Sequence, residues 1–330
     1  MITGISRSCW WLIFVAVIST ASILCGSNLF AASDYPSRPI TLIVPMPPGG
    51  VTDLSARALT ESLEKSLGKP VTVLNKPGGG YTIGGNAVAT AKPDGYTLGL
   101  LNVAAAQPEV FTYFYKAPYA NKDLKAVCRV FGPVLTISVK YDAPWNSVKD
   151  LVEYARKNPG LKVATHGRSG LSYVVLKSIA KKENVTFSDV PYEGGSPMVP
   201  ALLGGHVPVG CPAYPDASSL IEAKKLKVLA VLMEKRVAWA PDVPSIPDLG
   251  YKLAYESYLG IFGPKGLPDE IVATLNRAVQ KIAADPAFQK KIYATYTQVN
   301  YEPTSVYERS IAQYRDNLTA FFKEEGMVSK

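Results

Sequence analysis

Histidine and cysteine are scarce in this chain, with two and four copies among 330 residues. Zinc and haem sites draw their ligands largely from these two residue types, so neither kind of site is expected. No motif in the sequence requires an organic cofactor. We therefore predict neither a metal nor a cofactor.

Clustered positive charge is also missing. The chain has 35 Lys and Arg against 27 Asp and Glu, which gives a formal net charge of +8. The basic residues are dispersed, and the densest groups are pairs such as Lys181 with Lys182. A nucleic-acid interface needs a basic stripe or cluster, so a nucleic-acid partner is not expected.

The composition excludes a disordered chain. Apolar residues make up 47% and charged residues 19%, which is typical of a globular protein. The length exceeds that of one small core and allows two lobes with a cleft between them.

The N-terminus has the parts of a secretory signal peptide. Arg7 is the only charge before Asp34, residues 10–24 are largely apolar, and small residues follow at 31–33. We predict a signal peptide over residues 1–32, cleaved near Ala32, and a periplasmic protein. A membrane anchor is an alternative, although the apolar stretch is short for it. A lipid-anchored Cys25 is another, although Leu24 fits that site poorly.

Cleavage would leave Cys128 and Cys211 as the only cysteines. An exported chain can join two such residues in a disulfide, or both can remain buried free thiols. The sequence leaves these alternatives open.

Short apolar runs alternate with helical patterns. Residues 40–44 form a β-branched run that predicts a buried strand, and 52–67 predict a helix that Thr52 or Asp53 can cap. The alternation predicts an α/β fold with a parallel sheet and right-handed crossovers. Further strands are predicted at 71–74, 97–101, 126–130, 135–139, 162–164, 207–209 and 228–232, and helices at 82–91, 148–156, 172–182, 271–282 and 304–321. The aromatic stripe of the last helix predicts core packing.

Two glycine-containing loops follow strands and precede helices. Residues 45–53 contain Gly49 and Gly50, and residues 165–172 contain Gly167 and Gly170. Glycine allows backbone N–H groups to approach a ligand closely, and a helix N-terminus favours negative charge. Ligands of open parallel sheets bind at the carboxyl ends of strands, so the two loops predict an anion clamp across a cleft. A tight turn with a helix cap is the alternative for the first loop.

Enzyme motifs fail on spacing. Residues 78–84 have Ile83 where a dinucleotide fingerprint has its last glycine, and no Gly-Lys-Ser/Thr phosphate loop exists. Residues 167–171 approach a nucleophile elbow, but Leu171 replaces the final glycine. We therefore do not expect an enzyme, and a periplasmic hydrolase is kept only as the least favoured alternative.

A set of motifs spread over residues 35–286 resembles one family. The resemblance is carried by Tyr35-Pro36-Ser37-Arg38-Pro39-Ile40, Val44-Pro45-Met46-Pro47-Pro48-Gly49-Gly50-Val51-Thr52-Asp53-Leu54-Ser55-Ala56-Arg57, Asn75-Lys76-Pro77-Gly78-Gly79-Gly80, Pro93-Asp94-Gly95-Tyr96-Thr97-Leu98, Pro191-Tyr192, Leu202-Leu203-Gly204-Gly205, Pro241-Asp242-Val243-Pro244-Ser245, Tyr258-Leu259-Gly260-Ile261-Phe262-Gly263-Pro264 and Asp285-Pro286. In order and spacing these strings are similar to the Bug/TctC family, the extracytoplasmic solute-binding proteins of tripartite tricarboxylate transporters.

The resemblance implies a two-lobed periplasmic-binding-protein fold of type II that closes over a small organic carboxylate. The ligand would be a di-, tri- or aromatic carboxylate, delivered to a membrane permease of one large and one small subunit, and the protein would be a monomer. A ligand-presenting sensor for a membrane histidine kinase is the alternative role. We expect a first lobe of residues 33–134 plus 250–330 and a second lobe of residues 135–249.

Three departures from the family pattern bear on the pocket. Ser169 and Gly170 stand at the Gly-Ser/Thr places of the second loop, and Tyr173 stands where the family has a histidine. Tyr81 replaces a glycine, and the stretch 210–214 differs from the usual one.

Arg168 is a candidate for holding a second acid group of the ligand, with a solvent-facing arginine as the alternative. Asp53 could accept an amino group of an amino-acid ligand, although helix capping alone explains it. The candidate ligand-binding residues are Pro47, Pro48, Gly49, Gly50, Val51, Thr52, Asp53, Tyr81, Thr165, His166, Gly167, Arg168, Ser169, Gly170, Ser172, Tyr192, Cys211 and Tyr258.

Overall fold

The computed structural model describes residues 35–111, 116–253, 255–324 and 326. The predicted signal peptide lies outside these residues. Residues 38–330 form one compact unit, to which the following description refers, and of the other unit only residues 35–37 are described. Within the described residues, no helix combines the length and the apolarity that a membrane crossing requires.

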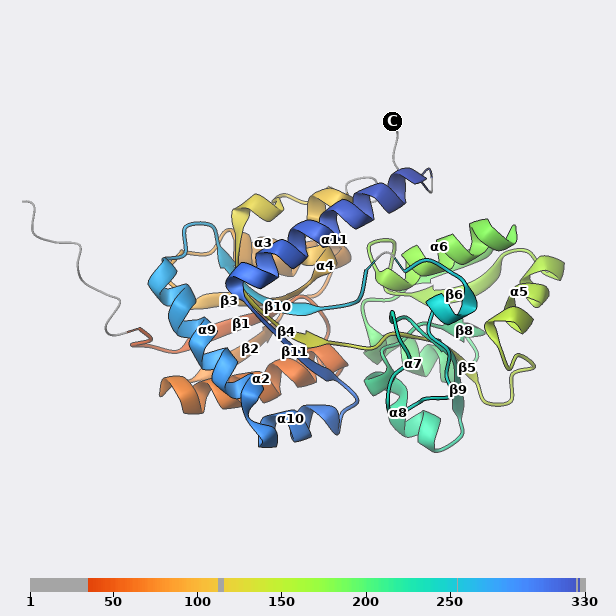
Figure 1. Cartoon of the computed structure of the whole chain (residues 1–330), viewed down its shortest axis with the longest axis horizontal. Coiled ribbons are helices and arrows are strands. Elements are labelled where there is room, and N and C mark those ends of the chain that lie inside the picture. The colour runs from red at the N-terminus through yellow and green to blue at the C-terminus, as the bar shows by residue number, and fades with distance from the viewer. Residues whose placement is uncertain (1–34, 112–115, 254, 325, 327–330) are drawn as a thin grey trace, which may run out of the picture. The chain divides into compact units, whose positions relative to one another are not determined.

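The first sheet contains six strands in the order β11-β4-β10-β3-β1-β2 (Figure 1). Strand β1 pairs in parallel with β2 and β3, whereas β10 runs antiparallel between β3 and β4, and β11 antiparallel to β4. The prediction of a parallel sheet is therefore correct for β1–β3 and wrong for the other half, because β10 enters the sheet from the second lobe rather than through a helical crossover. The strands are β1 (Ile40–Val44), β2 (Val71–Asn75), β3 (Thr97–Asn102), β4 (Leu124–Gly132), β10 (Leu259–Pro264) and β11 (Gln298–Pro303).

The second sheet contains five strands in the order β7-β6-β8-β5-β9. Strand β6 pairs in parallel with β7 and β8, and β5 pairs antiparallel with β8 and β9. This sheet is mixed as well. The strands are β5 (Thr136–Lys140), β6 (Leu161–Thr165), β7 (Phe187–Pro191), β8 (Val209–Gly210) and β9 (Leu226–Val231).

Helices pack on both sheets. Helix α2 packs on β1 and β2, α9 packs on β4 and α2, and α11 packs on β4. The α-helices are α2 (Val51–Leu67), α3 (Thr82–Ala89), α4 (Val103–Ala106), α5 (Val148–Lys157), α6 (Leu171–Glu183), α7 (Gly195–Leu203), α8 (Tyr214–Glu222), α9 (Asp269–Ala284), α10 (Pro286–Tyr293) and α11 (Thr304–Glu324). On α11 Tyr307, Ile311, Leu318 and Phe321 are buried, so the predicted core role of its aromatic stripe is confirmed.

The chain crosses from the first sheet to the second between β4 and β5, and returns between β9 and β10. The first crossing is residues 133–135, and the second is residues 232–258. Strands on either side of these crossings belong to different sheets, which gives two lobes built from discontinuous sequence. The lobe boundaries expected from the sequence stay a prediction.

The two cysteines among the described residues lie in different lobes. Cys128 belongs to β4 and Cys211 follows β8, and both are buried free thiols. Of the two alternatives that the sequence left open, the structure therefore has the unpaired one.

Candidate functional site

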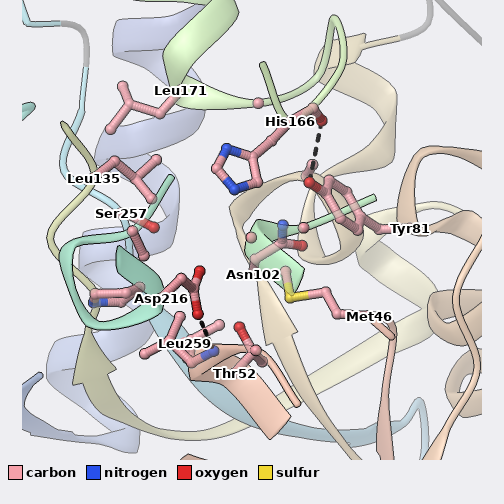
Figure 2. A pocket seen from close by; sticks show the side chains of 18 of the residues that line it. Met46, Thr52, Tyr81, Asn102, Leu135, His166, Leu171, Asp216, Ser257 and Leu259 are labelled. Carbon is pink, nitrogen blue, oxygen red and sulfur yellow. Dashed lines mark hydrogen bonds between the residues drawn. The ribbon is translucent and has the colours of Figure 1, made fainter. Parts of the chain in front are cut away.

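A pocket opens where loops of both sheets converge (Figure 2). The empty space that it encloses, including its mouth toward solvent, is about 680 Å³, which is within the range of small-molecule sites. Its walls are lined by Met46, Pro47, Gly50, Val51, Thr52, Asp53, Tyr81, Asn102, Val103, Ala104, Pro133, Leu135, His166, Ser169, Gly170, Leu171, Gly194, Gly195, Ser196, Ala213, Asp216, Tyr255, Ser257 and Leu259. Residues from both crossing segments are among them.

The first predicted loop forms one wall. Gly49 has φ +86°, and Gly50 is the N-cap of α2 with extended backbone at φ −87°. The predicted side-chain cap by Thr52 or Asp53 is wrong, because the helix begins earlier, at Val51, and its N-cap is a glycine. Asp53 instead accepts a hydrogen bond from the N–H of Gly49 at 3.0 Å, which fixes the loop that precedes its own helix.

Asp53 is buried at 2% exposure but is neutralised within its lobe. Its carboxylate accepts hydrogen bonds from Nε of Arg57 and from Nδ2 of Asn75, both at 3.0 Å. Burial raises the pKa of Asp53, but the hydrogen bonds from Arg57, Gly49 and Asn75 outweigh burial, and the pKa is lower than usual overall. This carboxylate therefore holds the loop in place and has its charge matched.

The second predicted loop forms the opposite wall. The N–H of His166 donates to Oγ of Ser172 at 3.1 Å, and the N–H of Gly167 donates to Oγ1 of Thr165 at 3.0 Å. Gly170 is the N-cap of α6, with extended backbone like that of Gly50. Desolvation lowers the pKa of His166 to about 4, so its imidazole is neutral near pH 7.

Three hydrogen bonds join the lobes around the pocket. The hydroxyl of Tyr81 donates to the carbonyl of His166 at 3.1 Å, and Oγ of Ser196 donates to the carbonyl of Pro48 at 3.2 Å. The N–H of Val51 donates to Oδ1 of Asp216 at 2.7 Å, so a carboxylate of the second lobe lies on the N-terminus of α2 (Figure 2).

The pocket gathers the N-termini of four helices of eight or more residues. The first residues of α2, α6 and α7 line it, and so does Asp216 in the first turn of α8. The first N–H groups of a helix have no partner within the helix and carry a partial positive charge. The charged side chains among the described lining residues are the two aspartates, and no lysine or arginine lines this pocket. Cationic character in it therefore comes from backbone groups.

Half of the sequence-predicted site residues line the pocket. They are Pro47, Gly50, Val51, Thr52, Asp53, Tyr81, His166, Ser169 and Gly170. Pro48, Gly49, Gly167, Thr165 and Ser172 lie in the same two loops behind this wall, where the last two hold the loop backbone by hydrogen bonds.

Four further candidates lie elsewhere. Arg168 is exposed, and its charge acts on Asp189 outside the pocket. Tyr258 is fully buried in the core, where its ring packs against Tyr307 at 5.5 Å between centroids. Cys211 is buried beside β6, and Tyr192 packs on the core of the second lobe. The side chains of Tyr258, Cys211 and Tyr192 pack in the core of their lobes. The side chain of Arg168 is exposed to solvent, so none of the four lines the pocket.

Sequence reasoning missed the α7 N-terminus, the α4 N-terminus and Asp216. Gly194 and Gly195 repeat the pattern of Gly49 and Gly50, a glycine pair between a strand and a helix, and this signal was available in the sequence. Asp216 had no such signal, because only the fold brings α8 against α2. In the described residues, no group of three or more His, Cys, Asp or Glu could hold a metal ion.

Comparison with known proteins agrees with this architecture. The family model described as "Tripartite tricarboxylate transporter family receptor", TctC, matches residues 55–327. A UPF0065 protein from the gbd 5' region of Cupriavidus necator is 31% identical over 307 residues, covering 91% of this chain and 89% of its own. BugT of Bordetella pertussis is 31% identical over 267 residues, covering 80% and 81%.

Solved structures show the same fold. The periplasmic binding protein BugD is 32% identical with a TM-score of 0.82, covering 90% of this chain and 100% of its own. An R. palustris protein with adipate has 26% identity and a TM-score of 0.83, covering 89% and 99%. MatC from Rhodopseudomonas palustris with bound malate has 26% identity and a TM-score of 0.76, covering 86% and 100%. The predicted two-lobed α/β fold is confirmed, and the chain belongs to the TctC family of tripartite tricarboxylate transporter receptors, which are periplasmic solute-binding proteins.

Proposed function

We propose that this protein captures a small organic carboxylate between its lobes and delivers it to a tripartite tricarboxylate-type permease of one large and one small subunit. It acts as an exported monomer in the periplasm, after cleavage of its signal peptide near Ala32. It binds its ligand without transforming it.

The convergence of helix N-termini on one pocket is the observation that carries the proposal. Residues of the first turns of α6 and α7 line the space between the lobes, together with the Gly170 and Gly194 caps. The backbone N–H groups of a helix N-terminus bind an anion without a cationic side chain, and glycine caps let a ligand oxygen come close. The apolar walls at Met46, Leu135 and Leu259 suit the carbon skeleton of an organic acid.

The structural relatives support the ligand class. Two of them hold malate and adipate, which are both small dicarboxylates. The same fold at 26% identity supports carboxylate binding in general rather than either compound.

A thermal-shift screen of residues 33–330 tests the proposal, followed by titration calorimetry of the hits. The panel contains mono-, di- and tricarboxylates, aromatic acids and amino acids, with the matching alcohols and amides as controls. A carboxylate at 100 times its Kd adds about 2.7 kcal/mol and raises Tm by several degrees. Absence of binding by every carboxylate, in protein shown by native mass spectrometry to be ligand-free, would contradict the proposal.

A further inference from the structure

Asp216 fills the anion position at the N-terminus of α2 with the protein's own carboxylate. Its Oδ1 accepts the N–H of Val51 at 2.7 Å, across the junction of the lobes. Gly195 leaves room for this side chain, since a Cβ at that position would overlap the carboxylate. On the α2 side, a Cβ on Gly50 would come within 3.6 Å of Oδ1. The aspartate therefore lies in a cradle of two glycines, one from each lobe.

Because Asp216 occupies the N-terminus of α2, it limits where a ligand carboxylate can bind. The α2 N-terminus already holds an anion, and Oδ2 of the same carboxylate lies against Gly195 at the start of α7, so the N-terminus of α6 remains for a ligand carboxylate. The second oxygen of Asp216 lies on the pocket side, facing the region of His166 (Figure 2). A ligand bound to the N-terminus of α6 thus meets the carboxylate of Asp216 on the opposite wall.

The charge of Asp216 has no cation to match it among the described lining residues. Asp53, the other lining acid, is paired with Arg57, and His166 is neutral near pH 7. A second carboxylate of a ligand would be repelled by Asp216, whereas a protonated amine would form a charge-assisted hydrogen bond. Burial raises the pKa of Asp216 to about 6, although the backbone N–H groups of Val51 and Ala213 oppose the shift, so the group is largely ionised at pH 7.5.

We propose that Asp216 is a specificity-determining residue that selects carboxylates bearing a protonated amino group over plain mono- and dicarboxylates. This inference rests on the proposed function and names the ligand class of the same pocket. The sequence analysis considered Asp53 as the acceptor of a ligand amino group. We assign this role to Asp216 instead, because the charge of Asp53 is already matched by Arg57.

The test compares matched acids by titration calorimetry at pH 7.5. Each pair differs by one α-amino group: succinate and aspartate, glutarate and glutamate, 3-phenylpropanoate and phenylalanine. The best-bound amino acid is expected to bind about tenfold or more tighter than its amine-free partner, the size of one charge-assisted hydrogen bond.

Asp216→Asn gives the decisive variant. The asparagine oxygen still accepts the N–H of Val51, so the lobe junction is kept while the charge is lost. The variant is expected to weaken the amino acid about tenfold or more and to leave the amine-free acid unchanged or tighter. Asp242→Asn is the matched control, because Asp242 is exposed outside the pocket and its loss changes the net charge equally.

The outcomes separate the two proposals. Amine-free acids that bind as tightly as their amino partners, with the same affinities in Asp216→Asn, would overturn the role of Asp216 and leave carboxylate capture standing. No binding of any acid by the ligand-free protein would overturn both.

Discussion

Asp53 and Arg57 lie one turn apart on α2, and Nε of Arg57 donates to Oδ2 of Asp53 at 3.0 Å. The arginine is 52% exposed, whereas the aspartate side chain is 3% exposed. The carboxylate beneath the first loop is thus neutralised from the outer surface of the lobe rather than by a ligand.

Replacing Asp53 should cost stability more than replacing its partner. Asp53→Ala removes the acceptor of three groups, the Gly49 N–H, Arg57 and Asn75, and is expected to lower the free energy of unfolding by about 2–4 kcal/mol. Arg57→Ala should cost below about 1 kcal/mol, because the guanidinium is half exposed. Urea unfolding measures both values. Equal losses of unfolding free energy in the two variants would mean that the ion pair stabilises the protein, and that the hydrogen bond from Gly49 to Asp53 does not.

The same site predicts an acid limit of stability. The folded-state pKa of Asp53 is below the unfolded value near 3.8, so its stabilisation is present above that value. It is lost as the pH falls through the folded value. Acid unfolding of Asp53→Asn should lack this contribution, and a parallel pH dependence in both proteins would contradict the assignment.

The adjacent glycines 49 and 50 should give separable effects. Gly49→Ala places a side chain at φ +86° with only Oγ of Ser196 nearby at 3.9 Å, so it should cost about 1–2 kcal/mol of stability. Gly50→Ala is unstrained at φ −87°, but its Cβ would lie 3.1 Å from Oγ of Ser196 across the lobe junction. It should therefore reduce ligand affinity about fivefold at nearly unchanged Tm. Adding Ser196→Ala should restore the affinity, and failure to do so would place the defect elsewhere.

The imidazole of His166 should titrate at about pH 4, because it is desolvated in the pocket wall. The sequence has one other histidine, His206, so NMR titration of two imidazole signals with His206→Gln for assignment measures it directly. A midpoint near 6.5 would show that water reaches the ring freely and that the pocket can carry a positive side chain.

Ligand affinity should depend on pH through Asp216. Of the other titratable groups that line the pocket, Asp53 on α2 has a pKa below its usual value and His166 before α6 has a pKa of about 4, and α7 contributes none among its described residues. Between pH 5 and 7.5 the change is therefore expected from Asp216, whose pKa is about 6. Protonation removes its negative charge, so the affinity for amino acids should fall with decreasing pH and that for amine-free acids should not. The dependence should vanish in Asp216→Asn.

Both thiols should be inert in the folded protein. Burial raises the pKa of Cys128 and of Cys211, and Asp189 adds to the shift of the latter. In protein of residues 33–330, which contains only these two cysteines, dithionitrobenzoate is expected to react with two thiols after denaturation without reductant, and with none before it. If fewer than two thiols react in the denatured protein, at least one cysteine is modified or paired.

The sequence predicted the parts of the fold that local patterns encode. The strand 40–44 is found with the predicted bounds, and the loops 45–53 and 165–172 contribute ten of the residues that line the pocket. Strand β7, by contrast, is half exposed and alternates Phe, Ser, Asp and Val, so no apolar run marked it. Helix α7 contains Pro197 and Pro200, which weaken a helical prediction.

The rest of the site depends on long-range contacts. Val51 and Asp216 are 165 positions apart, and neither residue shows in its local sequence that they meet. Tyr258 is the opposite case: it lies between the lining positions Ser257 and Leu259, just before β10, but its own side chain faces the core rather than the pocket.

Both crossing segments line the pocket, through Pro133 and Leu135 on one side and Tyr255 and Ser257 on the other. A molecule held in this pocket would contact both segments that join the lobes. If the lobes close by bending at these segments, we expect a wide acid to hold them further apart than a narrow acid of equal charge, so that the outer surfaces differ in angle. A permease of the proposed kind would then meet a surface whose shape depends on the size of the bound acid as well as on its presence.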